Sequence, residues 1–335
     1  MSAVRATVFG CEGPILGRDE AAFFREVNPW GFILFGRNVE NPTQLRDLTA
    51  ALRESVGRDA LVFVDQEGGR VQRLRAPHWR EWLPPLDTVG MTGRDAPRAM
   101  YLRSRLIAAE LRAVGIDGNC APVVDIAAEA THPFLKNRCY GNDLPCVVDV
   151  ARHVASGLLD GGVLPVMKHI PGHGRASLDT HLELPRVAET GDVLMASDFA
   201  AFRALSDLPA AMTAHIVFSA FDDLPATLSR RMVSMIRDDI GFGGLLMSDD
   251  LSMQALSGTI GQRAAAAIAA GCDIALHCNG ERAEMQAVAQ AAGVLSGQAL
   301  TRADAALAAR RAPDDADLAA LEAEFAGLMP VGADG

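Results

Sequence analysis

The chain has 335 residues, of which 49% are hydrophobic and 22% are charged, so it can bury a sizeable core and is not expected to be disordered in bulk. Its formal net charge of −11, with no run of Lys and Arg, argues against nucleic acid as a partner. No signal peptide or membrane-spanning segment is recognisable and the six cysteines form no C-x-x-C pair, so we expect a cytoplasmic protein with reduced thiols.

Short apolar runs alternate with segments of helical periodicity along most of the chain. Strands are predicted at residues 6–9, 31–35, 60–65, 116–124, 164–169, 211–218, 244–248 and 273–277. The clearest helices are predicted at residues 42–56, 96–114, 144–160, 191–205, 230–240, 260–270 and 282–295. Strands such as 61–64 are continuously apolar, as expected for parallel strands that are buried on both faces.

This alternation predicts an α/β fold with a parallel sheet, and about eight β-α units predict a single (β/α)8 TIM-type barrel over residues 1–300. Residues 301–335 are expected to form a C-terminal helical tail, with helices near 303–311 and 315–327, that packs on the barrel or frays from it. The alternative is an open doubly wound sheet, which would need a G-x-G-x-x-G turn after an early strand. Gly68 and Gly69 follow a strand, but that motif is not present there.

Polar side chains stand at the carboxyl ends of several predicted strands. These residues are Asp65, Asp125, Lys168, His169, His215, Asp249, Asp250 and His277. Charged groups directly after apolar strands are costly to bury without partners, and in a barrel this face collects the catalytic residues. The repetition of the pattern on several strands predicts one shared site.

Metal binding is one interpretation of these residues. His169 and His173 are four residues apart, but Pro171 and Gly172 between them exclude a regular helix that would present both to one ion. A metal-dependent hydrolase that uses His215 and His277 with Asp249 stays open as an alternative. We expect no metal and no cofactor, since a phosphate-binding glycine loop is also missing at a suitable place.

Three segments occur in a recognisable order. They are D-Q-E-G-G-R-V-Q-R-L at residues 65–74, K-H-I-P-G-H-G at 168–174 with D-T-H at 179–181, and S-D-D-L-S-M at 248–253. Together they resemble glycoside hydrolase family 3, and more narrowly its bacterial β-N-acetylglucosaminidases, the β-N-acetylhexosaminidases of peptidoglycan recycling. The resemblance extends from about residue 4 to about residue 295, and the K-H-x-P-G-H-G element with D-x-H is its most specific part.

The resemblance implies a role for each matching residue. Asp249 matches the catalytic nucleophile, His181 an unusual histidine general acid/base, and Asp179 the aspartate that pairs with it. The implied sugar-binding residues are Asp65, Arg73, Arg138, Lys168 and His169. The implied activity is that of a retaining exo-β-N-acetylglucosaminidase, acting on muropeptides that contain GlcNAc-1,6-anhydroMurNAc.

This chemistry suits the residue types. Retaining hydrolysis needs a carboxylate nucleophile and a group that first donates and later accepts a proton. Histidine titrates near neutral pH and can serve in both steps, while an aspartate two residues away can orient the ring and favour its charged form.

Other readings of the sequence stay open. A sugar phosphorylase could share the fold and the dyad, because a histidine repels incoming phosphate less than a carboxylate would. A non-catalytic sugar-binding protein is a further class, and chitin oligosaccharides are an alternative substrate. We expect a small carbohydrate partner and a monomer.

Overall fold

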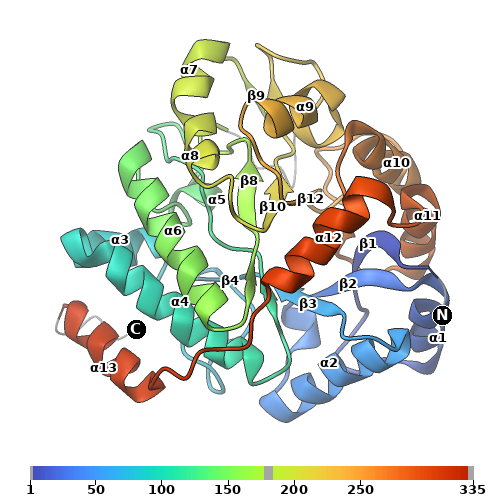
Figure 1. Cartoon of the computed structure of the whole chain (residues 1–335), viewed down its shortest axis with the longest axis horizontal. Helices are drawn as coiled ribbons and strands as arrows, with labels where there is room; N and C mark the ends of the chain where they lie inside the picture. The colour runs from blue at the N-terminus through green and yellow to red at the C-terminus, as the bar shows by residue number, and fades with distance from the viewer. Residues whose placement is uncertain (1–2, 177–183, 331–335) are drawn as a thin grey trace.

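The computed structural model describes residues 3–176 and 184–330. Helices surround centrally placed strands (Figure 1). The strands are β1 (Arg5–Gly10), β2 (Pro29–Leu34), β3 (Leu61–Val64), β4 (Gln66–Gly68), β5 (Val71–Gln72), β6 (Gly118–Asn119), β7 (Leu164–Pro165), β8 (Met167–Ile170), β9 (Arg186–Val187), β10 (Ala210–Thr213), β11 (Val217–Phe218), β12 (Leu245–Met247) and β13 (Ala275–His277). The α-helices are α1 (Arg18–Val27), α2 (Pro42–Val56), α3 (Pro85–Thr92), α4 (Ala96–Arg112), α5 (Pro133–Lys136), α6 (Leu144–Asp160), α7 (Gly191–Ala196), α8 (Asp198–Ala204), α9 (Arg230–Asp238), α10 (Ile260–Ala270), α11 (Arg282–Ala292), α12 (Gly297–Ala309) and α13 (Leu318–Leu328).

The central strands form parallel sheets, which confirms the predicted α/β class. One sheet has the order β13-β1-β2-β3-β6-β7 and a second has the order β12-β10-β8, with parallel pairing throughout. Only Val166 separates β7 from β8, and an isolated parallel bridge joins Met247 of β12 to Ile274 beside β13. Among the described strands the pairing gives these two central sheets and two further two-stranded sheets, none of them closed, so the closed barrel stays a prediction.

Three helices have the predicted bounds because the sequence caps them. Asn41, Asp143 and Thr259 precede α2, α6 and α10, and each side chain accepts a backbone N–H of the first turn. Gly57 and Gly271 end α2 and α10 in the left-handed conformation. Local capping therefore sets the bounds of these helices.

The single helix predicted over residues 191–205 is wrong, because Ser197 separates α7 from α8. Two polar side chains at this break accept hydrogen bonds from Arg175. Its Nε donates to Asp198 at 2.6 Å, and its Nη2 donates to the Ser197 hydroxyl at 3.1 Å. The interruption of the helix thus anchors the segment that follows β8.

The predicted strands 60–65, 244–248 and 273–277 are shortened to β3, β12 and β13, and three others differ more strongly. The strand over 116–124 is reduced to β6, since Pro122 has no N–H to donate to a neighbour. The predicted strand 164–169 is β7 and β8, and 211–218 is β10 and β11, of which β11 pairs with β9 outside the two central sheets. Helices α1, α3 and α5 and the hairpin of β4 and β5 were not predicted.

Helix α12 ties together the amino-terminal ends of two strands. Asp117, just before β6, and Asp273, just before β13, are buried and each accepts an N–H from the neighbouring strand. Arg310 of the α12 carboxyl end pairs with Asp117, and Nη1 of Arg302 donates to Asp273 at 3.0 Å. In Figure 1, α12 crosses in front of the strands. The helix therefore lies at the amino-terminal ends of the strands, the face that in barrel folds contributes to stability and not to catalysis.

The described helices include none that is both long and apolar enough to cross a membrane.

Arg302→Ala and Arg310→Ala are each expected to lower the free energy of unfolding by about 1–3 kcal/mol, because a buried carboxylate loses a charged hydrogen-bond donor. Urea unfolding measures the change. The exposed pair of Arg152 with Asp207 supplies the control, and Arg152→Ala should cost much less. Equal losses in the three variants would contradict a special role for α12, and catalytic rates should be unchanged in all of them.

Candidate active site

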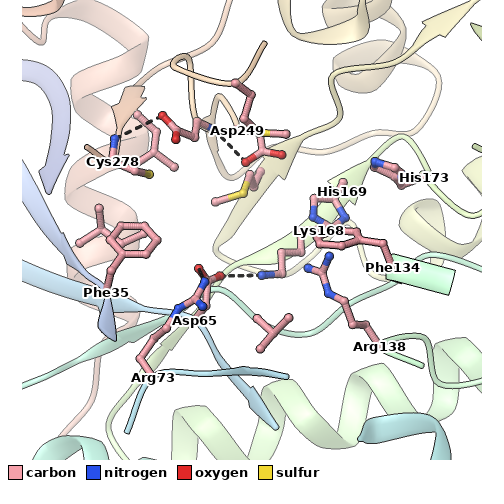
Figure 2. A pocket seen from close by; sticks show the side chains of 16 residues that line it. Phe35, Asp65, Arg73, Phe134, Arg138, Lys168, His169, His173, Asp249 and Cys278 are labelled. Carbon is pink, nitrogen blue, oxygen red and sulfur yellow. Dashed lines mark hydrogen bonds and ion pairs between the residues drawn. The ribbon is translucent and has the colours of Figure 1, made fainter. Parts of the chain in front are cut away.

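A pocket opens at the carboxyl ends of the central strands (Figure 2). Its lining comes from elements that are far apart in sequence, as expected where parallel strands converge. The residues are Ile33, Phe35, Asp65, Val71, Arg73, Phe134, Arg138, Lys168, His169, His173, Met212, Asp249, Asp250, Met253, Leu276 and Cys278. The structure thus brings together six predicted site residues, namely Asp65, Arg73, Arg138, Lys168, His169 and Asp249.

One wall of the pocket is a network of alternating charges. Lys168 lies between two carboxylates, with its Nζ 2.8 Å from Oδ1 of Asp65 and 2.6 Å from Oε1 of Glu67. Arg138 binds Glu67 with two parallel hydrogen bonds of 2.8 and 2.9 Å, and Nη2 of Arg73 donates to Asp65 at 3.1 Å. Every cation in this wall faces a carboxylate, which satisfies charges that would be costly to bury alone.

The network keeps its members ionised. Burial alone would raise the pKa of Glu67, but Arg138 and Lys168 hold it at about 2. Burial would also raise the pKa of Asp65, yet Lys168 and Arg73 hold it well below its usual value. Burial disfavours the charged form of Lys168, but the two carboxylates raise its pKa overall. The wall therefore presents fixed donors and acceptors that suit the hydroxyl groups of a neutral sugar.

Asp249 lies on the other side of the pocket, two residues after the end of β12 (Figure 2). Its Oδ1 accepts the N–H of Asp250 at 2.8 Å, which fixes the carboxylate. Burial would raise its pKa, but the imidazoles of His215 and His169 and the Asp250 N–H lower it overall. An ionised, oriented carboxylate facing the charged wall can act as a nucleophile.

The neighbouring carboxylate of Asp250 is used within the protein. It accepts the Ser252 hydroxyl at 2.6 Å, the Ser252 N–H at 3.0 Å and the Cys278 N–H at 3.2 Å. These bonds tie the turn after β12 to the end of β13. Asp250 therefore supports the turn that carries Asp249.

Asp125 organises the K-H-I-P-G-H-G segment. It is fully buried, and its Oδ2 lies 2.7 Å from Nδ1 of His169. Its Oδ1 accepts the backbone N–H groups of His169 at 3.2 Å and His173 at 2.7 Å. The four-residue spacing of His169 and His173 thus allows the single carboxylate of Asp125 to accept the backbone N–H groups of both.

The histidines proposed for a metal do not converge. His215 bonds to Thr227 at 2.8 Å and to the Asp250 carbonyl at 3.0 Å. His277 is absent from the pocket lining and lies 3.4 Å from Glu284 of α11. Within residues 3–176 and 184–330, His, Cys, Asp and Glu side chains form no group of three or more that could hold a metal ion.

Sequence reasoning missed Glu67, although it lies within the D-Q-E-G-G segment. It lies on β4, in a hairpin with β5 whose strands are too short to show periodicity. Phe35 and Phe134 were missed as well. The available signal for Glu67 was an acidic residue two positions from Asp65, immediately before two glycines.

Asp179 and His181 lie outside the described residues, so their proposed roles stay predictions. Pro171 to Ala176 are described on one side of them and Leu184 and Pro185 on the other.

The sequence matches the glycosyl hydrolase family 3 N terminal domain over residues 18–311. The chain belongs to glycoside hydrolase family 3. It is 38% identical to a β-hexosaminidase of Alkalilimnicola ehrlichii over 280 residues, which cover 81% of this chain and 80% of that protein. It is therefore a glycoside hydrolase, as the resemblance implied.

Solved structures of the family are similar over most of the chain. NagZ from Neisseria gonorrhoeae in complex with N-trifluoroacetyl-D-glucosamine is 30% identical, with a TM-score of 0.87 over 97% of this chain and 98% of that one. A family 3 β-N-acetylglucosaminidase from Paenibacillus is 31% identical, with a TM-score of 0.81 over 98% of this chain and 62% of that one. The family fold thus accounts for almost the whole of this chain.

His173 is expected to reduce stability in acid. Burial, with a contribution from His169, lowers its pKa to about 4 from 6.5, so the unfolded chain takes up this proton at a higher pH than the folded one. Its contribution to stability is therefore lost progressively as pH falls from about 6.5 towards 4. Between pH 7 and pH 5, the free energy of unfolding of His173→Asn should fall by about 1–2 kcal/mol less than that of the wild type. Urea unfolding at the two pH values measures this difference.

The control is the exposed His78, and His78→Asn should follow the wild-type pH dependence. The same dependence in His173→Asn as in wild type would show that His173 does not titrate in this way.

Proposed function

We propose that the chain is a retaining exo-β-N-acetylglucosaminidase. The observation that carries this proposal is the ionised Asp249 facing the Asp65–Lys168–Glu67–Arg138 network across one pocket. Such a pocket suits a sugar whose anomeric carbon meets Asp249 while its remote hydroxyls meet the charged wall. Asp249 attacks that carbon, and a covalent glycosyl-aspartate forms and is then hydrolysed.

The sugar contacts of the proposal are Asp65, Arg73, Arg138, Lys168 and His169. Lys168 and Asp65 are rigidly paired, so they can exchange hydrogen bonds with adjacent hydroxyls without reorganising. His169 is oriented by Asp125, which leaves its Nε2 for the sugar. The relative from Neisseria gonorrhoeae binds N-trifluoroacetyl-D-glucosamine, which supports an N-acylated sugar in this site.

His181 is the proposed general acid/base, and Asp179 orients and polarises its ring. The first step needs a proton for the leaving oxygen, and the second needs a base for the attacking water. In the catalytic complex the imidazole should stand about 5 Å from Asp249, the separation expected of a retaining pair.

The proposed natural substrate is a muropeptide that contains GlcNAc-1,6-anhydroMurNAc, which the family resemblance supports. A closed (β/α)8 barrel over residues 1–300 with a helical tail over 301–335 belongs to the same proposal. It is supported by the continuity of β7 into β8 and by the bridge beside β13. The monomer and the cytoplasmic location stay predictions.

Asp249→Asn should lower kcat by at least about 10³-fold, because the glycosyl-enzyme cannot form. The substrate is a chromogenic N-acetyl-β-glucosaminide. In the wild type, a slow-leaving fluorinated sugar should label Asp249, which mass spectrometry of peptides locates. Labelling of Asp250, or turnover of the Asn variant at the wild-type rate, would falsify the assignment.

Two additions to the same assay separate the other reaction classes. Phosphate should not yield a sugar phosphate, since such a product would identify a phosphorylase. A chelator should leave the rate unchanged. Loss of activity with the chelator would support the metal-dependent alternative.

His181→Ala should lose about 10²–10⁴-fold in kcat/KM on a disaccharide, the usual range for general acid–base catalysis. The loss on an aryl glycoside with an acidic leaving group should be smaller, because that group needs little protonation. Asp179→Ala should show the same pattern more mildly. Equal losses on good and poor leaving groups would rule out His181 as the acid.

A further inference from the structure

Residues 80–83 back the charged wall of the pocket. They lie against the outer side of the β4–β5 hairpin, which contains Glu67 and ends next to Arg73. Gly69 donates its backbone N–H to the Trp82 carbonyl at 2.7 Å, and Trp82 donates its backbone N–H to Oε1 of Gln72 at 3.1 Å. The Gln72 amide in turn donates to the carbonyl of Arg80 at 2.7 Å. The hairpin is therefore bonded at several points to this backing segment.

Arg103 of α4 joins the same segment to Glu67. Its side chain is fully buried, and its Nη2 donates to the carbonyls of Glu67 at 2.6 Å and Leu83 at 2.7 Å. Its guanidinium lies 5.6 Å from the centroid of the Trp82 ring. Gly68 has a φ of +106°, and a Cβ there would overlap this guanidinium, so the hairpin is built around Arg103.

Helix α13 covers the outer face of this arrangement and packs on α4 (Figure 1). The Phe325 ring meets the Trp82 ring edge to face, with centroids 5.7 Å apart. The Arg80 guanidinium lies over both rings, 4.6 Å from Trp82 and 5.2 Å from Phe325. Phe325 is buried while most of α13 is exposed, so Phe325 is the side chain by which α13 covers Trp82, together with Arg80.

We propose that α13 positions the sugar-binding wall, with Phe325 as its positioning residue. Phe325 holds Trp82, Trp82 holds the hairpin through Gly69 and Gln72, and the hairpin carries Glu67, which fixes the cations of the wall. The inference rests on the proposed sugar-binding role of that wall. Helix α13 follows the matched family domain, which ends at residue 311, although the solved relatives are similar over 97–98% of this chain.

The effect should fall on substrate binding rather than on the chemical step. Asp249 follows β12 on the opposite side of the pocket, and none of the contacts described above reaches it. Loosening the wall weakens contacts that the sugar makes in both the ground state and the transition state. Loss of such uniform binding raises KM and leaves kcat nearly unchanged.

The test is Phe325→Ala in the full chain, with kinetics on the chromogenic N-acetyl-β-glucosaminide. We expect KM to rise roughly tenfold with kcat nearly unchanged, since small displacements of positioning groups have large effects. The tryptophan emission should shift to the red as Trp82 becomes solvated. Phe325→Leu, which keeps most of the apolar cover, should recover most of the binding and serves if the Ala variant does not fold.

The matched control is Val288→Ala, a buried truncation on α11, away from α13 in Figure 1. It should lower Tm without changing KM or the emission. A red-shifted Phe325→Ala variant with unchanged KM overturns the proposal, as does an equal rise of KM in Val288→Ala. If Phe325→Ala does not fold, a red-shifted Phe325→Leu with unchanged KM overturns it in the same way.

Arg138→Lys distinguishes a failure of the α13 inference from a failure of the proposed sugar-binding wall. It removes the paired hydrogen bonds to Glu67 and should raise KM if the wall binds sugar. A rise of KM in Arg138→Lys without one in Phe325→Ala refutes the inference alone. An unchanged KM in Arg138→Lys refutes the proposed sugar-binding wall itself.

Discussion

The bond between Lys168 and its two carboxylates is the constraint on which the pocket depends. A buried ammonium is tolerated only where its charge is matched and its hydrogens are accepted, and Asp65 and Glu67 together meet both conditions. Glu67 in turn is stable there because Arg138 binds it in bidentate geometry. Removing Glu67 would leave the buried Arg138 without its carboxylate, and removing Lys168 would leave Asp65 and Glu67 with one cation each. The site is therefore a unit, and the loops that contribute to it must reach it in register.

The parallel strands explain how residues so distant in sequence meet. Asp65 follows β3, Lys168 lies within β8 and Asp249 comes shortly after β12. Their side chains reach one pocket because these strands run in the same direction. Strand alternation decides which neighbours join them. Leu276 of β13 lines the pocket, while the adjacent His277 faces Glu284 of α11. A polar residue at a strand end is thus a candidate for the site, and its register decides whether it belongs there.

The difference between local signals and strand register explains how much of the fold and the site the sequence could predict. Elements with their own caps, such as α2 and α10, were predicted to the residue, and strand-end groups such as Asp65 and Asp249 were predicted from the charge that follows an apolar run. The β4–β5 hairpin was not predictable by periodicity, because its strands have three and two residues, and Glu67 was missed with it. At the break, Ser197 bonds to Arg175, which approaches from another segment. Local signals define elements, whereas pairings between distant segments need the folded chain.

The two carboxy-terminal helices act on opposite sides of the same scaffold. Helix α12 neutralises Asp117 and Asp273 at the amino-terminal ends of β6 and β13, where the proposed chemistry does not take place, so its contribution is to stability. Helix α13 instead packs behind the wall that carries Glu67, through Trp82. A charge network of this kind tolerates little displacement, because both the desolvation cost and the hydrogen-bond geometry depend on separations below 3 Å. Packing behind the hairpin is the physical means by which so short a two-strand element can hold such separations.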